Sequence, residues 1–438
     1  MLRGHGWVVV AALAVVAVGM AFSVAWEPVV RGVPAWITPG DVWGTFREAH
    51  IVAWGGEGIL YQQITTGFIS FPGIAVVLAP VAMVSSALHL SESYPFVLQY
   101  PSAWLLLGPA EMALGSVALF PLDTLAVRLG MPRRRRIALI WLEAAAIWPS
   151  VALWGHPEDL VALAFALYGV MAAVDGKSKK CAILFGAAVA FQPLTILLVP
   201  IAFAYVPFRQ WLRSAAVVVA PSALLLVAPL VHAWRTTIYA LVDQPTFPTV
   251  MHPTPWVALS PVLARGRVSQ SRLAHVNGAV VVMHSTTHAV EVVAGGPSRL
   301  FAVGLAIVLG VVVWRKRPAL RTVMWLAALA LVGRCLFESV MVAYYLVPGL
   351  ALCLLVAASV SRRRLAAAAV CAAACTVLSY AVLDRWAYYL GVAGLSLATW
   401  GLARPPGAIA STSSEVSPHA VGAPQPVAAL LTGAASPV

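Results

Sequence analysis

Residues 7–26 read WVVVAALAVVAVGMAFSVAW, an uncharged run of twenty residues in which Ser23 is the single hydroxyl side chain. About twenty apolar residues are enough for a helix to cross the hydrocarbon core of a bilayer. Because lipid offers the backbone no hydrogen-bond partner, such a run is expected to be helical. The composition agrees, since 61% of the 438 residues are hydrophobic and 10% are charged, against roughly 25% charged in soluble domains. The sequence therefore predicts an all-α polytopic transmembrane protein.

Similar apolar runs recur along residues 1–404, which predicts a transmembrane domain of about 11–13 helices. Two polar stretches, 27–67 and 234–298, interrupt the pattern and are expected to be long outer loops. Residues 405–438 are rich in Pro, Ala, Ser and Gly, which predicts a disordered cytoplasmic tail. The expected spans are 7–26, 68–88, 101–124, 137–154, 158–175, 181–206, 214–233, 299–314, 321–336, 340–359, 365–383 and 386–402.

Most basic residues lie in short clusters between the apolar runs. This pattern orients helices with the clusters in the cytoplasm, and it predicts a multi-pass protein with a cytoplasmic N-terminus. Although the net charge is +12, the clustering argues for the bilayer and against nucleic acid as the partner. The clusters are Arg133–Arg136, Lys177–Lys180, Arg209 with Arg213, Arg315–Arg321 and Arg362–Arg364.

The orientation rule constrains residues 181–206, because Lys180 and Arg209 both belong in the cytoplasm. The segment must therefore enter and leave the membrane on the same side. Phe191-Gln192-Pro193 supplies a break at its middle, since proline removes a backbone donor and disfavours helix in the preceding residue. Two half-membrane helices meeting at Gln192 are expected.

A parity problem remains upstream of the first arginine cluster. Three spans before that cluster would place it outside, whereas the orientation rule places it inside. Either 68–88 is re-entrant around Pro80, or residues 89–127 contain an irregular crossing.

The first candidate site is the segment PGDVWGTFREAH, residues 39–50, which follows the first span. A carboxylate held there by aromatic neighbours can be desolvated and act as a general base, which makes Asp41 a candidate catalytic residue. Glu48 is a candidate substrate-binding residue. The alternative is an interfacial amphipathic helix with Asp41 as its N-cap, which needs no chemistry.

The second candidate site is WGHPEDL, residues 154–160, between two expected spans. Pro157 followed by Glu158 and Asp159 is typical of a helix start, where acidic residues favour the helix dipole. His156 beside them is not explained by that role, because adjacent ionisable groups between spans are costly unless they line a wet cavity. Adjacent positions rarely chelate one ion together, so no metal site is expected.

The third candidate site contains Arg334 and Glu338, which are four residues apart and can pair on one helix face. Alternatively, the guanidinium of Arg334 binds an anionic group such as a phosphate. Tyr344 follows closely in the sequence.

The fourth candidate site lies in the proline-rich segment 243–256. His252 is a candidate acid or base. Trp256 is a candidate for stacking on a sugar or lipid, or else an anchor at the membrane interface. If the basic clusters face the cytoplasm, all four candidate sites lie on the opposite side.

Together these segments resemble the GT-C glycosyltransferase superfamily, in particular the polyprenyl-phosphomannose-dependent mannosyltransferases of bacterial envelopes. Asp41 with the downstream Leu60-Tyr61 is similar to that family's first outer loop, which carries the catalytic aspartate. Gly155–Asp159, followed by an alanine-rich run, is similar to a recurrent segment. Phe191-Gln192-Pro193 looks like the family's Phe-Lys-Pro helix break, with Gln192 where the family has lysine. The likeness of layout spans roughly residues 7–360.

The resemblance implies transfer of a sugar from a polyprenyl phosphate to a glycolipid or glycan acceptor at the outer face of a bacterial plasma membrane. It implies no cofactor beyond the lipid-linked donor. Asp41 is the expected base and His252 the weaker candidate, while Arg334 takes the place of the missing lysine beside the phosphate. The other expected substrate-binding residues are Glu48, His156, Glu158, Asp159, Gln192, Glu338, Tyr344 and Trp256.

Two other classes of protein fit the pattern. A transporter or lipid flippase also places ionisable residues in helix breaks and wet cavities, and Glu143, inside a spanning run, is where that hypothesis starts. A non-catalytic envelope-assembly protein would tolerate glutamine at position 192. An outer cavity shared by Asp41, His156 and Arg334, with a lateral gap toward lipid, would favour the enzyme.

Overall fold

The chain divides into two compact units, Met1–Pro406 and Gly407–Val438, and every element below belongs to the first. The predicted disorder of the tail falls on residues 408–438, which lie outside the described residues. The computed structural model describes residues 6–31, 35–62, 70–92, 100–246, 248, 252–276, 279–295, 298–381 and 384–407.

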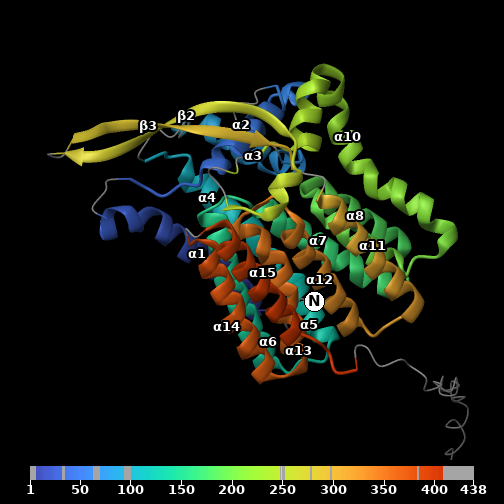
Figure 1. Ribbon diagram of the computed structural model, residues 1–438. Coiled ribbons are helices and arrows are strands. Elements are labelled where there is room, and N and C mark those ends of the chain that lie inside the picture. The colour runs from blue at the N-terminus through green and yellow to red at the C-terminus, as the bar shows by residue number, and fades with distance from the viewer. Residues whose placement is uncertain are drawn as a thin grey trace, which may run out of the picture. The chain divides into compact units, whose positions relative to one another are not determined.

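Helices dominate the first unit (Figure 1). They are α1 (Gly6–Trp26), α2 (Gly40–Ala53), α3 (Gly73–Ala87), α4 (Trp104–Ser116), α5 (Leu119–Arg128), α6 (Arg133–Ala152), α7 (Pro157–Val174), α8 (Ser178–Phe191), α9 (Val199–Phe203), α10 (Trp211–Ile238), α11 (Arg299–Lys316), α12 (Leu320–Phe337), α13 (Val347–Val360), α14 (Arg362–Ser379) and α15 (Arg385–Leu402).

Among the described residues, six helical segments are long and apolar enough to cross a membrane. They confirm the expected polytopic helical membrane protein. Helices α6 and α14 begin with runs of arginine, which add charge to otherwise apolar helices. The six segments are Gly6–Val29, Trp104–Arg128, Pro157–Val174, Phe208–Asp243, Leu320–Phe337 and Ala343–Val360.

Hydrogen bonds between helices bring the basic clusters together at one end of the helices, which we call the basic end. The Arg135 guanidinium donates to the carbonyl oxygen of Ala358 at 2.8 Å, and Arg321 donates to the carbonyl oxygen of Leu129 at 3.5 Å. Clusters that are far apart in the sequence therefore share one level of the helices. The orientation rule expects such clusters to share one side of the membrane.

The segment around Gln192 turns back as expected. Helix α8 ends at Phe191, Gln192 is extended (φ −146°, ψ 108°), and a 3₁₀ segment, Pro193–Leu198, leads into α9. Lys177 and Gln210, at the two ends of this segment, line one surface groove. The two ends of the segment therefore lie close together, as the prediction requires.

The expected span at 68–88 is wrong. Helix α3 has 15 residues, about 22 Å of helix against about 30 Å of hydrocarbon core. It runs unbroken through Pro80 and packs along α2. It ends where His89 takes a left-handed φ of 52°, a common helix stop. Trp104–Arg128, which contains the expected span at 101–124, is long enough to cross a membrane, whereas α3 is not among the six segments of that length.

The expected outer loop at 234–298 is wrong in part, because it contains regular structure. Helix α10 continues to Ile238 past a kink at Ala233. Strands β2 (Val262–Val276) and β3 (Ala279–Val293) pair antiparallel as the long hairpin in Figure 1. A short pair, β1 (His252–Pro253) with β4 (Val340–Met341), ties this region to the segment after α12.

Candidate functional site

Three side chains from two distant segments form a continuous hydrogen-bonded chain, which we call the Asp41 chain: Asp41, His156 and Glu158. It lies at the end of the helices opposite the basic end, which we call the acidic end. His156 Nε2 lies 3.1 Å from Asp41 Oδ2, and His156 Nδ1 lies 2.7 Å from Glu158 Oε1. Because both ring nitrogens face carboxylate oxygens, the imidazole donates to both only when it is doubly protonated. The geometry therefore favours an imidazolium between two carboxylates.

The electrostatics of the chain agree with its geometry. Burial disfavours charge on His156, but Glu158 and Asp41 outweigh burial and hold the pKa of His156 well above its ordinary value. Partial burial likewise disfavours the Asp41 carboxylate, yet the hydrogen bond and charge of His156 lower the pKa of Asp41. The Asp41 side chain is 62% exposed, against 13% for His156. Asp41 is thus an ionised carboxylate within reach of an incoming molecule.

The backbone around Gly155 explains how α2 comes so close to His156. Gly155 has a positive φ of 72°, a conformation that favours glycine. A β-carbon there would lie 2.1 Å from Val42 Cγ2 of α2, so a larger residue would push α2 away. Helix α2 begins at Gly40 after Pro39, and Asp41 is its second residue. The alternative of Asp41 as an N-cap is therefore wrong, because its carboxylate bonds to His156 instead.

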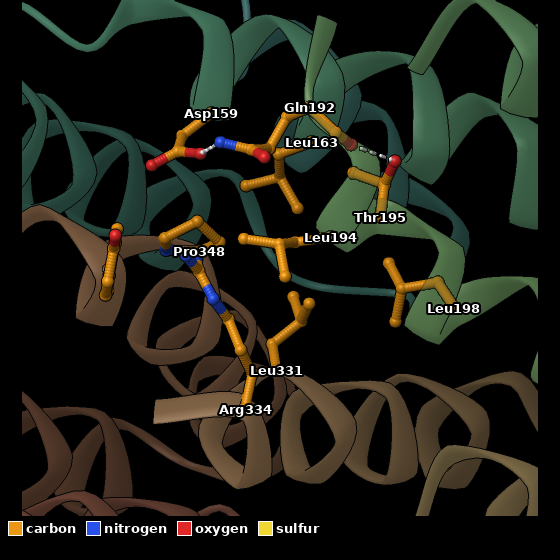
Figure 2. A pocket seen from close by; sticks show the side chains of 10 residues that line it. Asp159, Leu163, Gln192, Leu194, Thr195, Leu198, Leu331, Arg334 and Pro348 are labelled. Carbon is orange, nitrogen blue, oxygen red and sulfur yellow. Dashed lines mark hydrogen bonds between the residues drawn. The ribbon is translucent and has the colours of Figure 1, made fainter. Parts of the chain in front are cut away.

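A second group of polar residues lines a small adjoining cavity (Figure 2). Gln192 Nε2 donates to Asp159 Oδ1 at 2.5 Å, and Arg334 points into the same cavity from α12. The cavity measures about 20 Å³, which is room for roughly one water molecule. The family-like break at Gln192 thus supplies a hydrogen-bond donor to a buried carboxylate.

Arg334 is held by neighbours on its own side of the cavity. Its Nε lies 3.4 Å from Glu338 Oε1, so the expected pair forms. Its guanidinium lies 3.8 Å from the centre of the Tyr345 ring, a close cation–π contact. The adjacent Tyr344 stacks on His156 at 3.9 Å. The two tyrosines therefore lie between the Asp41 chain and the Arg334 cavity.

The cavity that Arg334 lines is not the expected one, because neither Asp41 nor His156 is part of its wall. The structure brings Asp41 to His156, but Arg334 lines the neighbouring cavity with Asp159 and Gln192. The two groups adjoin through the consecutive residues Glu158 and Asp159.

Other expected site residues serve contacts within the protein. His252 stacks on Tyr388 at 3.8 Å, and burial lowers the pKa of His252. Trp256 Nε1 donates to the carbonyl oxygen of Leu336 at 2.7 Å. These contacts separate His252 and Trp256 from the Asp41 chain and fit the anchoring alternative.

Glu48 lies seven residues after Asp41 on α2, which is about two helical turns along the same face. It is fully buried on α2. Burial, and then the nearby charge of Glu48, raise the pKa of Tyr61 well above its ordinary value. Glu48 therefore belongs to the packing between α2 and the segment that follows it.

The sequence reading missed Arg299, the first residue of α11. Its Nε lies 3.0 Å from Glu338 Oε2, and its guanidinium also donates to Gln244. Its side chain is 25% exposed, against 6% for Arg334. The signal was available: Arg299 is an arginine on the side where the orientation rule predicts few.

An apolar groove of about 410 Å³ lies beside the break at Gln192. Phe165 and Phe191, with ring centres 5.9 Å apart, form part of its wall. Val77 of α3 and Val117, next to α4, complete it from the other side. The groove is a lateral apolar surface, and its wall does not include Asp41, His156 or Arg334.

No protein-family model and no curated protein matches this chain. The resemblance to GT-C glycosyltransferases therefore stays a prediction. Among the described residues, no three His, Cys, Asp or Glu side chains are grouped so as to hold a metal ion.

Proposed function

We propose that the protein is an integral membrane glycosyltransferase that moves a sugar from a polyprenyl phosphate to an envelope glycolipid or glycan. The observation that carries the proposal is the exposed Asp41 carboxylate, held by His156 and Glu158 at the end opposite the basic clusters. With those clusters in the cytoplasm, the site faces outward from the plasma membrane of a bacterium. The resemblance described above suggests mannose as the sugar.

In the proposed reaction Asp41 takes the proton from the acceptor hydroxyl. The acceptor oxygen bonds to the sugar C1 as the bond from C1 to the phosphate oxygen breaks, and the lipid phosphate leaves with the electron pair. Protonated His156 keeps Asp41 ionised until the proton arrives. Cations stabilise the leaving phosphate, and Arg299 suits this role better than the more deeply buried Arg334.

The groove beside Phe165 and Phe191 supports the choice of a lipid-linked donor. Its wall is almost wholly apolar, and it reaches the level of Gln192, next to Asp159. An isoprenoid chain lying there would bring its phosphate toward the acidic end, and the bilayer would supply the donor from the side.

The test uses the purified full chain in lipid nanodiscs with a radiolabelled mannosyl polyprenyl phosphate and a mixture of envelope glycolipids. Label is expected on a new glycolipid with the native chain and not with Asp41→Asn. Recovery of unaltered donor from both proteins would contradict the proposal. In sealed vesicles, movement of intact donor between leaflets without new product would point instead to a flippase.

A further inference from the structure

A second groove lies away from the Asp41 chain, between α6, α13 and α14. Its volume is about 240 Å³. One water molecule occupies about 30 Å³ in the liquid, so the groove has room for a much larger group. Its wall is formed by aliphatic side chains such as Leu142 and Leu350, and by small residues such as Ala146 and Ala373. Leu142 and Ala373 are exposed on the outside of the helices. The groove therefore opens on the surface that faces hydrocarbon in a membrane.

Glu143 is the feature that distinguishes this groove. It contributes to the wall, is fully buried, and has no hydrogen-bond partner for either carboxyl oxygen among the described residues. It lies ten residues after Arg133, the first residue of α6, about 15 Å along the helix. That places it near the middle of the hydrocarbon core, where a lone carboxylate is very costly and the neutral acid is favoured.

The neutral acid of Glu143 has an O–H donor without an acceptor in the part of the chain that the structure describes. The other polar side chain in the wall, Thr376, donates its hydroxyl to the carbonyl oxygen of Ala372 at 3.0 Å. Thr376 is therefore satisfied within its own helix. An unmade hydrogen bond in an apolar wall is costly, and a ligand that brings one acceptor would complete it.

Glu111 provides a comparison within the same chain. It is also fully buried, and neither carboxyl oxygen has a hydrogen-bond partner within the described ranges. Its electrostatic neighbours are Glu158 and His156, so it belongs to the surroundings of the Asp41 chain. Glu111 is not part of the wall of this groove. An unpaired buried carboxyl and an open apolar groove coincide at Glu143.

We propose that the groove between α6, α13 and α14 binds the apolar chain of a membrane-soluble molecule whose carbonyl oxygen accepts a hydrogen bond from the Glu143 carboxyl. The ligand enters sideways from the hydrocarbon of the bilayer. A plain hydrocarbon chain would leave the acid unpaired, and a charged headgroup would not reach this depth. The site is separate from the proposed transferase site.

The first test is labelling with a fluorescent, membrane-soluble carbodiimide in nanodiscs containing the full chain. The probe reacts when the carboxyl oxygen adds to the carbodiimide carbon and the proton passes to nitrogen. Peptide mass spectrometry is expected to find the label on Glu143 and not on Glu111, and Glu143→Gln is expected to abolish it. Ala373→Phe, which narrows the groove and leaves Glu143 itself unchanged, is expected to slow labelling about tenfold. Labelling unchanged by Ala373→Phe, or absent from Glu143, would overturn the proposal.

The second test identifies the ligand chemistry by protection. A long-chain methyl ketone is expected to slow labelling of Glu143 about tenfold, because one hydrogen bond in apolar surroundings is worth roughly 1–1.5 kcal/mol. An alkane of the same length is the matched control and is expected to protect far less. Equal protection by the ketone and the alkane would show that the Glu143 carboxyl does not bind the carbonyl oxygen of the ligand, and the proposal would fail.

Discussion

The two ends of the helices handle buried charge in different ways. At the basic end two arginine–carboxylate pairs are bidentate: Arg136 meets both oxygens of Asp123 at 2.9 and 2.7 Å, and Arg128 meets both oxygens of Asp175 at 2.7 and 2.9 Å. At the acidic end hydrogen-bonding capacity remains unused. Glu158 Oε2 is buried without a hydrogen-bond partner among the described residues.

The difference teaches which charges are structural and which are available for a ligand. A bidentate arginine–carboxylate pair fixes geometry and leaves little capacity for another partner. A carboxylate with a spare buried oxygen is costly and needs a reason to persist. Both ends lie among apolar helices, so the contrast reflects how the side chains are paired. The contrast agrees with the proposed transferase site at the acidic end and with a structural role for the bidentate pairs at the basic end.

The largest expected effect comes from making the same substitution, aspartate to asparagine, at each of the two ends and comparing the results. Asp41→Asn is expected to lower transferase turnover about 100-fold or more, because removal of a general base costs roughly 10²–10⁴ in rate. Asp175→Asn, the matched change at the basic end, is expected to leave turnover unchanged. Initial rates with the labelled donor measure both. Equal loss in the two variants would erase the distinction between the ends.

The next effect concerns stability at the basic end. Arg136→Met leaves the fully buried Asp123 without its bidentate partner, and breaking such a pair costs about 3–5 kcal/mol. Arg128→Met breaks a pair whose side chains are 36% and 29% exposed, so we expect about 1 kcal/mol or less. Unfolding in detergent followed by tryptophan fluorescence measures the difference. Similar losses would mean that burial does not separate the two pairs.

Some of this organisation could be predicted from the sequence because its signals are local. Phe191-Gln192-Pro193 predicts the break in α8 since proline acts on its immediate neighbours. Arg334 and Glu338 are four residues apart, so their pairing follows from helix geometry. The hairpin β2–β3 was missed, although Asn277-Gly278, followed by the valine-rich run 279–283, is a typical hairpin signal.

The site itself depends on contacts that no local pattern reports. Asp41 and His156 are 115 residues apart, and their meeting requires the close approach of α2 to Gly155. The sequence predicted that both lie on one side of the membrane, but not that they touch. Likewise, hydrophobicity predicted a span at 68–88, because composition does not report that α3 packs along α2.

A smaller effect on turnover is expected from substituting His156, the middle residue of the Asp41 chain. His156→Gln keeps a polar side chain but removes the imidazolium, and we expect turnover to fall about tenfold, less than for Asp41→Asn. The pKa of His156 is raised in the folded protein. Its stabilising contribution is therefore complete below the ordinary pKa of 6.5 and is lost as the pH rises through the raised value.

Thermal unfolding across a pH series tests that sign. Native protein is expected to lose stability on the alkaline side, and His156→Gln is expected to remove that loss. The pKa of Asp41 is lowered, so its contribution is present above the ordinary pKa of 3.8 and disappears as the pH falls through the lowered value. An alkaline loss that persists unchanged in His156→Gln would assign it to another group.

The smallest expected effect comes from a substitution at Gln192 that gives the acidic end an ion pair like those of the basic end. Gln192 donates to one oxygen of Asp159, and the other oxygen, Oδ2, is buried without a hydrogen-bond partner among the described residues. Gln192→Lys would place a cation there and neutralise a carboxylate that repels the donor phosphate. We expect the KM for the lipid donor to fall about threefold, the scale of a modest ion pair. Gln192→Met, which removes the hydrogen bond without adding charge, is the control and is expected to raise KM. A fall in KM with both substitutions would mean that the charge of Asp159 does not act on the donor. The unpaired Oδ2 of Asp159 would then have no bearing on ligand binding.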